Sequence, residues 1–280
     1  MSEGKNEQQA TSAVTGWDCH AHVFGPYDKY PLAADRSYTP PEAVQADYAA
    51  MLARHGMSHG VLVHPSAYGA EHSLLLDTLA AMPNARVVVV VQPDTMPTLK
   101  GLRDRGVRAA RYSHRSGAGV NFAGSASWDD LLAMSGTLAD AGLHAELWTD
   151  CKALPAIATR LKEFPFPVVI DHMGGFDVHA GIDEPGFQTL LSLLGSGKVW
   201  VKLCAYRNVL KEPSMEPGRV FHDAMLAANP DALVWGSDWP HLNVKPAPDT
   251  SKLFATFKDW TGSEEMIHRI LVTNPSRLYL

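Results

Sequence analysis

The chain has 280 residues, of which 46% are hydrophobic and 19% are charged, and its formal net charge is -6 with histidine neutral. This composition excludes disorder of the whole chain, and an acidic balance with no basic run disfavours a nucleic-acid partner. No apolar run reaches the roughly 18 residues that a membrane span needs, so no membrane partner is expected.

The cysteines and the N-terminal segment indicate the cellular setting. Cys19, Cys151 and Cys204 form an odd set without CxxC spacing, which disfavours both a disulfide framework and a cysteine zinc site. Residues 1–12 are polar and lack the apolar segment of a signal peptide, so we expect a flexible tail ahead of one domain, 13–280. We therefore expect a cytoplasmic location.

Apolar runs alternate with helical segments along the chain. Five consecutive valines, 87–91, are typical of a strand that is buried on both faces. Strands are expected at 14–22, 59–64, 86–92, 107–112, 144–148, 167–172, 199–204 and 232–238. Helices are expected at 41–55, 71–81, 97–105, 128–141, 153–163, 185–194, 217–228, 250–259 and 263–271.

Eight strands separated by helices predict a single-domain α/β fold, the closed (β/α)8 or TIM barrel. The alternative is an open, doubly wound sheet. That fold is expected to carry a glycine-rich phosphate turn after an early strand, and the sequence has neither GxGxxG nor GxxxxGKS. The barrel is therefore favoured.

Polar side chains gather at the predicted strand ends, which meet at one mouth of a barrel. His20 and His22 share a face of the first strand, where two imidazoles can hold a divalent metal or polarise a carbonyl. The other candidates at or just after strand ends are His64, Ser66, Arg111, Tyr112, His114, Trp148, Asp150, Asp171, His172, Lys202, Arg207, Asp238, His241 and Asn243. Several imidazoles and a carboxylate at one mouth predict an active site.

Three of these segments carry a resemblance to a known family. Asp18-Cys-His-Ala-His22, Ile170-Asp-His-Met-Gly174 and Trp235-Gly-Ser-Asp-Trp-Pro-His241 resemble motifs of the amidohydrolase superfamily. The chain is most similar to the branch of small lactone hydrolases typified by 2-pyrone-4,6-dicarboxylate lactonase. The likeness runs from His22-Val-Phe-Gly-Pro26 to Leu271-Val-Thr-Asn-Pro-Ser-Arg-Leu-Tyr279 and covers nearly the whole chain. It implies a barrel that hydrolyses lactones.

The resemblance also implies roles for the catalytic residues. Asp238 would be the general base that deprotonates the attacking water, and His20, His22 and His172 would polarise the scissile carbonyl. A carboxylate that is flanked by cationic groups stays ionised, as a base must.

The sequence offers fewer candidate metal ligands than the metal-dependent members of the superfamily have. Those members use an additional ligand from the fourth or fifth strand. Here those strands offer Arg111 and Trp148, which cannot ligate, while Glu146 lies deeper in the barrel. His20, His22 and Asp238 could hold one Zn²⁺. We expect that no metal is required.

Basic residues predict an anionic substrate, because guanidinium groups match carboxylates and sulfonates in two-point contacts. Together with Lys202, the arginines Arg111, Arg115 and Arg207 give the barrel a positively charged mouth. The predicted substrate-binding residues are Arg111, Arg207, Tyr38, Ser66, Trp148, Lys202 and Asn243. Gly117 and Gly175 stand where the dicarboxylate lactonase has arginines, and Trp148 stands where the family has a tyrosine. These differences favour a substrate with fewer anionic groups or with a bulkier apolar part facing Trp148.

The predicted reaction is therefore hydrolysis of a small carboxylated or sulfonated lactone, within the breakdown of aromatic compounds or sugar acids. A lactone isomerase or a metal-dependent, non-oxidative decarboxylase on the same barrel is the alternative. A non-enzymatic protein that binds sugar acids or aromatic acids is a third reading. The sequence leaves open whether the chain forms a homo-oligomer.

Overall fold

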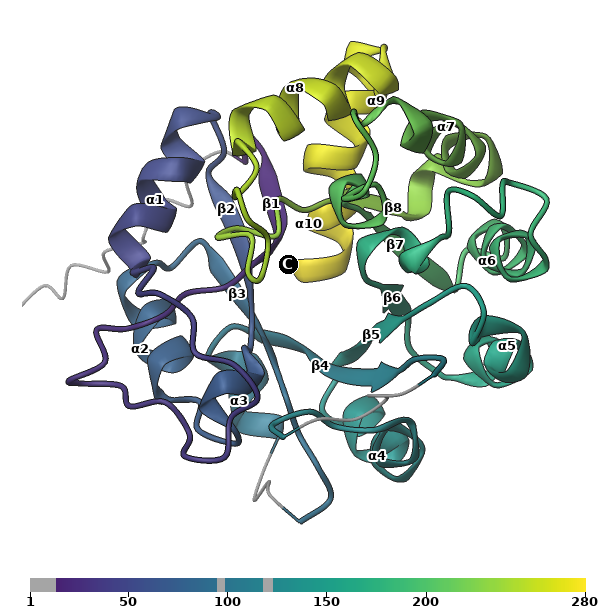
Figure 1. Cartoon of the computed structure of the whole chain (residues 1–280). Coiled ribbons are helices and arrows are strands. Elements are labelled where there is room, and N and C mark those ends of the chain that lie inside the picture. Colours follow the sequence, from purple (N-terminus) through teal and green to yellow (C-terminus); the bar gives the residue numbers. More distant parts are fainter. Residues whose placement is uncertain (1–13, 95–98, 118–122) are drawn as a thin grey trace, which may run out of the picture.

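The computed structural model describes residues 14–94, 99–117 and 123–280 (Figure 1). The predicted N-terminal tail lies outside these residues. Within them, eight parallel strands form one sheet in which each strand pairs with the next along the chain. The strands are β1 Trp17–Ala21, β2 His59–Val63, β3 Ala85–Val89, β4 Val107–His114, β5 His144–Thr149, β6 Val168–Ile170, β7 Val199–Leu203 and β8 Leu233–Trp235.

Helices surround the strands as an outer layer in Figure 1. Their bounds are α1 Gln45–Arg54, α2 Ser73–Ala81, α3 Lys100–Asp104, α4 Trp128–Asp140, α5 Leu154–Glu163, α6 Pro185–Gly195, α7 Arg219–Ala228, α8 Thr250–Thr261, α9 Glu264–His268 and α10 Asn274–Tyr279. Two short 3-10 helices, η2 His172–Gly175 and η3 Ala205–Asn208, follow β6 and β7. No helix in the described ranges is long and apolar enough to cross a membrane.

The sheet closes where the chain leaves β8. The backbone N–H of His22 donates to the carbonyl of Trp239 at 2.8 Å, and the N–H of Asp238 donates to the carbonyl of His20, also at 2.8 Å. These bonds join the last strand segment to the first. The TIM barrel prediction is confirmed, and the open sheet is wrong.

Two strands are shorter than predicted because the backbone turns at functional residues. The sixth and eighth strands were expected to reach His172 and Asp238, but β6 ends at Ile170 and β8 at Trp235. His172 and Asp238 have φ angles of 48° and 58°, in the left-handed region, which cannot continue a strand ladder. Both side chains therefore project from turns above the sheet.

The C-terminal helix α10 covers the bottom of the barrel and was not expected, since the predicted helices stop at 271. Tyr279, the last residue of α10, stacks on Trp17 with ring centroids 5.9 Å apart. The Tyr279 carbonyl accepts hydrogen bonds from Arg86 (3.2 Å) and Arg108 (2.8 Å). Trp17, Arg86 and Arg108 lie near the starts of β1, β3 and β4, so the other end of the barrel is the open mouth.

The buried interior agrees with the sequence pattern. Val87, Val88 and Val89 are fully buried in β3, as expected of a strand with no wet face. The three cysteines are buried and free. The expectation of a protein without a disulfide framework is therefore confirmed for the described residues.

Candidate active site

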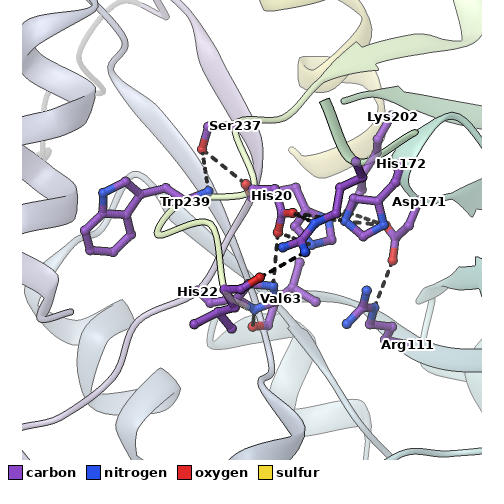
Figure 2. Close-up of polar contacts among 12 residues, drawn as sticks. His20, His22, Val63, Arg111, Asp171, His172, Lys202, Ser237 and Trp239 are labelled. Carbon is purple, nitrogen blue, oxygen red and sulfur yellow. Dashed lines mark hydrogen bonds and ion pairs between the residues drawn. The ribbon is translucent and has the colours of Figure 1, made fainter. Parts of the chain in front are cut away.

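Asp238 is the residue on which the three predicted histidines converge. Its Oδ1 lies 3.8 Å from Nε2 of His20 and 3.6 Å from Nε2 of His22, and its Oδ2 lies 3.6 Å from Nε2 of His172. Figure 2 shows the imidazoles of His20 and His22, from the end of β1, beside that of His172, which follows β6. The strand-end motifs of the sequence thus form one cluster.

Strained backbone surrounds this carboxylate. After Asp238, both His241 (φ 64°) and Asn243 (φ 60°) also adopt the left-handed conformation, as does Met173 (φ 54°) beside His172. Such conformations cost of order 1–3 kcal/mol each and persist only where the surrounding structure imposes them. Their concentration around Asp238 and His172 marks this mouth as the functional end of the barrel.

The 3-10 helix after β7 supplies two further partners of the carboxylate. The Tyr206 hydroxyl donates a 2.7 Å hydrogen bond to Asp238 Oδ2, and the Arg207 Nε contacts the same oxygen. Arg207 Nη1 also donates to the Leu242 carbonyl at 3.0 Å. Arg207 was predicted, whereas Tyr206 was missed. Its signal in the sequence was its place directly before Arg207 at the exit of a predicted strand.

These neighbours fix the charge of Asp238. Burial alone would raise its pKa, but His172, His22 and Arg207 hold the pKa of the carboxyl well below its usual range. The group is therefore ionised at neutral pH and can accept a proton.

The imidazole of His22 has a defined proton. Its Nδ1 lies 2.8 Å from the Val63 carbonyl, and because a carbonyl can only accept, Nδ1 carries the hydrogen. Burial lowers the pKa of His22, whereas Asp238, which faces Nε2, acts in the opposite direction. Burial and Lys202 together lower the pKa of His20 well below its ordinary value.

A buried ionic cluster lies beneath the histidines. The Lys202 ammonium is 2.5 Å from Glu146 Oε2, 3.2 Å from Asp171 Oδ1 and 3.2 Å from His20 Nδ1. Arg111 Nε donates to Asp171 Oδ2 at 2.8 Å, as Figure 2 shows. The sequence placed Asp171 at a strand end and Glu146 deeper in the barrel. Their shared ion pairs with Lys202 were not predicted.

The structure corrects the prediction that Lys202 binds substrate. Its side chain is fully buried and, within the described residues, it is not part of the cavity wall. The reason is its place in β7 before the strand end, where it points into the barrel interior toward Glu146 and Asp171.

A cavity of about 290 Å³ opens above Asp238. Every other predicted substrate-binding residue lines it. The lining is made by His22, Ser37, Tyr38, Pro65, Ser66, Arg111, Trp148, His172, Arg207, Asp238, Leu242 and Asn243. His20 is fully buried and lies behind Asp238, outside this lining as far as the described residues go.

The family follows from a comparison with known proteins. A model of the amidohydrolase family matches residues 17–280, which contain the whole barrel and every site residue. The chain belongs to the amidohydrolase family.

Individual amidohydrolase relatives match over nearly their full length. A 4-sulfomuconolactone hydrolase of Hydrogenophaga intermedia is 33% identical over 94% of this chain and 88% of its own. A D-galactarolactone isomerase of Agrobacterium fabrum is 26% identical over 94% and 90%. The crystal structure of a candidate 2-pyrone-4,6-dicarboxylic acid hydrolase from Pseudomonas putida superposes with a TM-score of 0.79, at 31% identity over 95% of this chain and 98% of that one.

Trp148 organises the cationic side of this amidohydrolase cavity. The Arg111 guanidinium lies 5.5 Å from the Trp148 ring and that of Arg115 lies 4.6 Å from it. Arg115 does not line the cavity above Asp238 but a neighbouring one of about 490 Å³, also bordered by Arg207. Of the predicted cationic mouth, Arg111 and Arg207 therefore face the cavity directly.

The donor set is compatible with a divalent metal. Ligand atoms of His20, His22 and Asp238 lie within 4.8 Å of one another, as do those of His172, Cys204 and Asp238. Nε2 of His20 and Nε2 of His172 are buried without a hydrogen-bond partner among the described residues. Such atoms fit a cation in the site, as the amidohydrolase family often employs.

Proposed function

We propose that this amidohydrolase hydrolyses the ring ester of a small carboxylated or sulfonated lactone. The observation that carries the proposal is an ionised, buried carboxylate, Asp238, at the base of a cavity that two guanidinium groups line. A base and an anion-binding wall are what this reaction needs. The similarity to 4-sulfomuconolactone hydrolase supports the same substrate class.

In the proposed mechanism, Asp238 takes a proton from a water molecule, and the water oxygen forms a bond to the lactone carbonyl carbon. The ring C–O bond then breaks and its oxygen receives the proton held by Asp238, so the product carries a hydroxyl, or its keto tautomer, and a carboxylic acid that releases its proton to solvent. His22 and His172, which line the cavity, are placed to polarise the carbonyl.

Substrate binding is assigned to the rest of the lining. Arg111 and Arg207 would hold the carboxylate or sulfonate, and Trp148 would contact the apolar part of the ring. Tyr38, Ser66 and Asn243 would donate or accept hydrogen bonds at the ring substituents.

A metal, if bound, would be held by His20, His22 and Asp238 and would acidify water and polarise the carbonyl. We propose that none is required. Oδ2 of Asp238 already accepts from Tyr206 and Arg207, so only Oδ1 is left for an ion.

The proposal is tested by turnover of 4-sulfomuconolactone, 2-pyrone-4,6-dicarboxylate and D-galactarolactone in ¹⁸O-labelled water. We expect one ¹⁸O atom in the product carboxylate of a charged lactone. Turnover without label would identify an isomerase, and release of CO₂ would identify a decarboxylase.

The base is tested with Asp238→Asn. We expect kcat to fall by about 10²- to 10⁴-fold with little change in KM, since the amide cannot accept the proton. Asp140→Asn, an exposed change on α4, is the matched control and should keep full activity. Full activity of Asp238→Asn would refute its role.

The metal requirement is tested by dialysis against a chelator and by metal analysis of the purified protein. We expect activity to survive when the zinc content is far below one equivalent. Stoichiometric zinc together with loss of activity on chelation, restored by zinc, would show that a metal is required.

A further inference from the structure

Lys202 lies at the centre of a group of side chains that resembles a metal-binding site. Ligand atoms of His20, Glu146 and Asp171 lie within 4.8 Å of one another. The Lys202 Nζ contacts all three, at 3.2 Å from His20 Nδ1, 2.5 Å from Glu146 Oε2 and 3.2 Å from Asp171 Oδ1. The ammonium group thus takes the place of a cation in this cluster.

The surroundings keep Lys202 charged. All four side chains are fully buried, and the two carboxylates are balanced by Lys202 and by Arg111, which donates to Asp171. The second oxygen of Glu146 accepts a 2.8 Å hydrogen bond from a tyrosine hydroxyl of α10. Two carboxylate oxygens within 3.2 Å of Nζ, those of Glu146 and Asp171, favour the charged ammonium.

A lysine ammonium has only donors, so the nitrogen it contacts must accept. Nδ1 of His20 therefore carries a lone pair. A neutral imidazole has one N–H, which then resides on Nε2, on the side of the ring that faces Asp238 Oδ1 at 3.8 Å.

One neighbour favours the opposite tautomer. Asp171 Oδ1 lies 3.2 Å from His20 Nδ1 and could accept a proton from it. Asp171, however, already has two cationic partners, Lys202 at 3.2 Å from Oδ1 and Arg111 at 2.8 Å from Oδ2, whereas an N–H on Nδ1 would face the Lys202 ammonium. The position of Lys202 decides between the two tautomers.

We propose that Lys202 is a positioning residue that holds His20 in the Nε2–H tautomer. The His20 proton then points at the catalytic carboxylate Asp238 and favours its ionised form. The same proton occupies the position from which His20 would bind a metal ion. The Lys202 ammonium thereby supplies a positive charge on the Nδ1 side of His20, whereas a metal would supply one on the Nε2 side. This inference rests on the proposed role of Asp238 as the base.

The decisive experiment is long-range ¹H–¹⁵N NMR of the wild-type protein with ¹⁵N-labelled histidine. The ¹⁵N shifts of a neutral ring distinguish the protonated nitrogen from the one with a lone pair. The His20 signals are identified by their loss in His20→Gln. A proton on Nε2 supports the proposal, and a proton on Nδ1 overturns it. Because no substrate is used, this result is independent of whether the protein hydrolyses lactones.

Removal of the ammonium tests the cause. In Lys202→Met, we expect the His20 proton to move to Nδ1, where Asp171 accepts it, and Zn²⁺ affinity measured by calorimetry to rise by about 10- to 100-fold. The matched control is Lys198→Met, an exposed lysine just before β7, which should change neither readout. An unchanged tautomer in folded Lys202→Met would overturn the proposal. If that variant does not fold, the wild-type spectrum decides alone.

Discussion

The Tyr206 hydroxyl donates a 2.7 Å hydrogen bond to Oδ2 of Asp238, and the two oxygens of this carboxylate have different partners. Oδ2 accepts from Tyr206 and also contacts Arg207 and, at 3.6 Å, the His172 ring. Oδ1 faces only imidazole nitrogens, those of His20 and His22, among the described residues. Oδ1 is therefore the oxygen that is available to a water molecule.

Tyr206→Phe should raise the pKa of the proposed base, Asp238, without abolishing catalysis. A hydrogen bond to a charged group contributes about 1.5–3 kcal/mol, and its loss removes one of the partners that stabilise the ionised form of Asp238, so the Asp238 pKa rises. The acid limb of kcat/KM against pH should move to higher pH. Tyr30→Phe, which removes a hydroxyl from the half-exposed Asp77, is the control. An unmoved acid limb would contradict this account.

Arg207→Gln should discriminate between charged and uncharged lactones. Loss of a charged hydrogen-bond donor to a substrate anion raises KM by about 10- to 100-fold. KM for an uncharged lactone should change much less. Arg160→Gln, which alters a surface ion pair with Glu163 on α5, serves as the control. Equal effects on both substrates would show that Arg207 acts only through Asp238.

Gly236→Ala should impair catalysis through His20. A Cβ at this position would lie 2.6 Å from His20 Cβ and 3.1 Å from its backbone nitrogen, so His20 must shift. Overpacking of this kind costs about 1–3 kcal/mol, and a misplaced catalytic group can cost on the order of 100-fold in rate. Chemical unfolding and kcat measure the two effects. Gly136→Ala, on α4 with open space around it, should keep full activity.

His144 should make the fold sensitive to acid. Burial lowers its pKa to about 3 from the ordinary 6.5, so between these values the unfolded chain binds a proton that the folded chain does not. Its stabilising effect is present above pH 6.5 and is lost as the pH falls toward 3, at about 1.4 kcal/mol per pH unit.

Urea unfolding at several pH values measures this effect. In His144→Gln, the slope of the unfolding free energy against pH should decrease by about 1.4 kcal/mol per unit across this range. His179→Gln, at an exposed histidine, should leave the slope unchanged. A wild-type slope equal to that of His144→Gln would contradict the prediction.

The helices, the strands and most of the candidate site residues were predictable, because hydrophobic patterning along the sequence indicates where strands lie and where they end. The valine run at 87–91 identified a doubly buried strand, and the periodic exits of strands placed His20, His172 and Asp238 at one mouth. Strand ends were less predictable. Left-handed turns at His172 and Asp238 shorten β6 and β8, and these turns depend on tertiary contacts rather than on residue type.

The sequence by itself determined the barrel, the family resemblance and the residues that face the mouth, because strand parity and order along the chain are local properties. Only the tertiary structure decided depth and pairing. It placed Lys202 beneath the site rather than in it, brought Tyr206 to Asp238, and laid α10 under the barrel. Such contacts join residues from distant segments, and their geometry follows from how the closed sheet packs its interior.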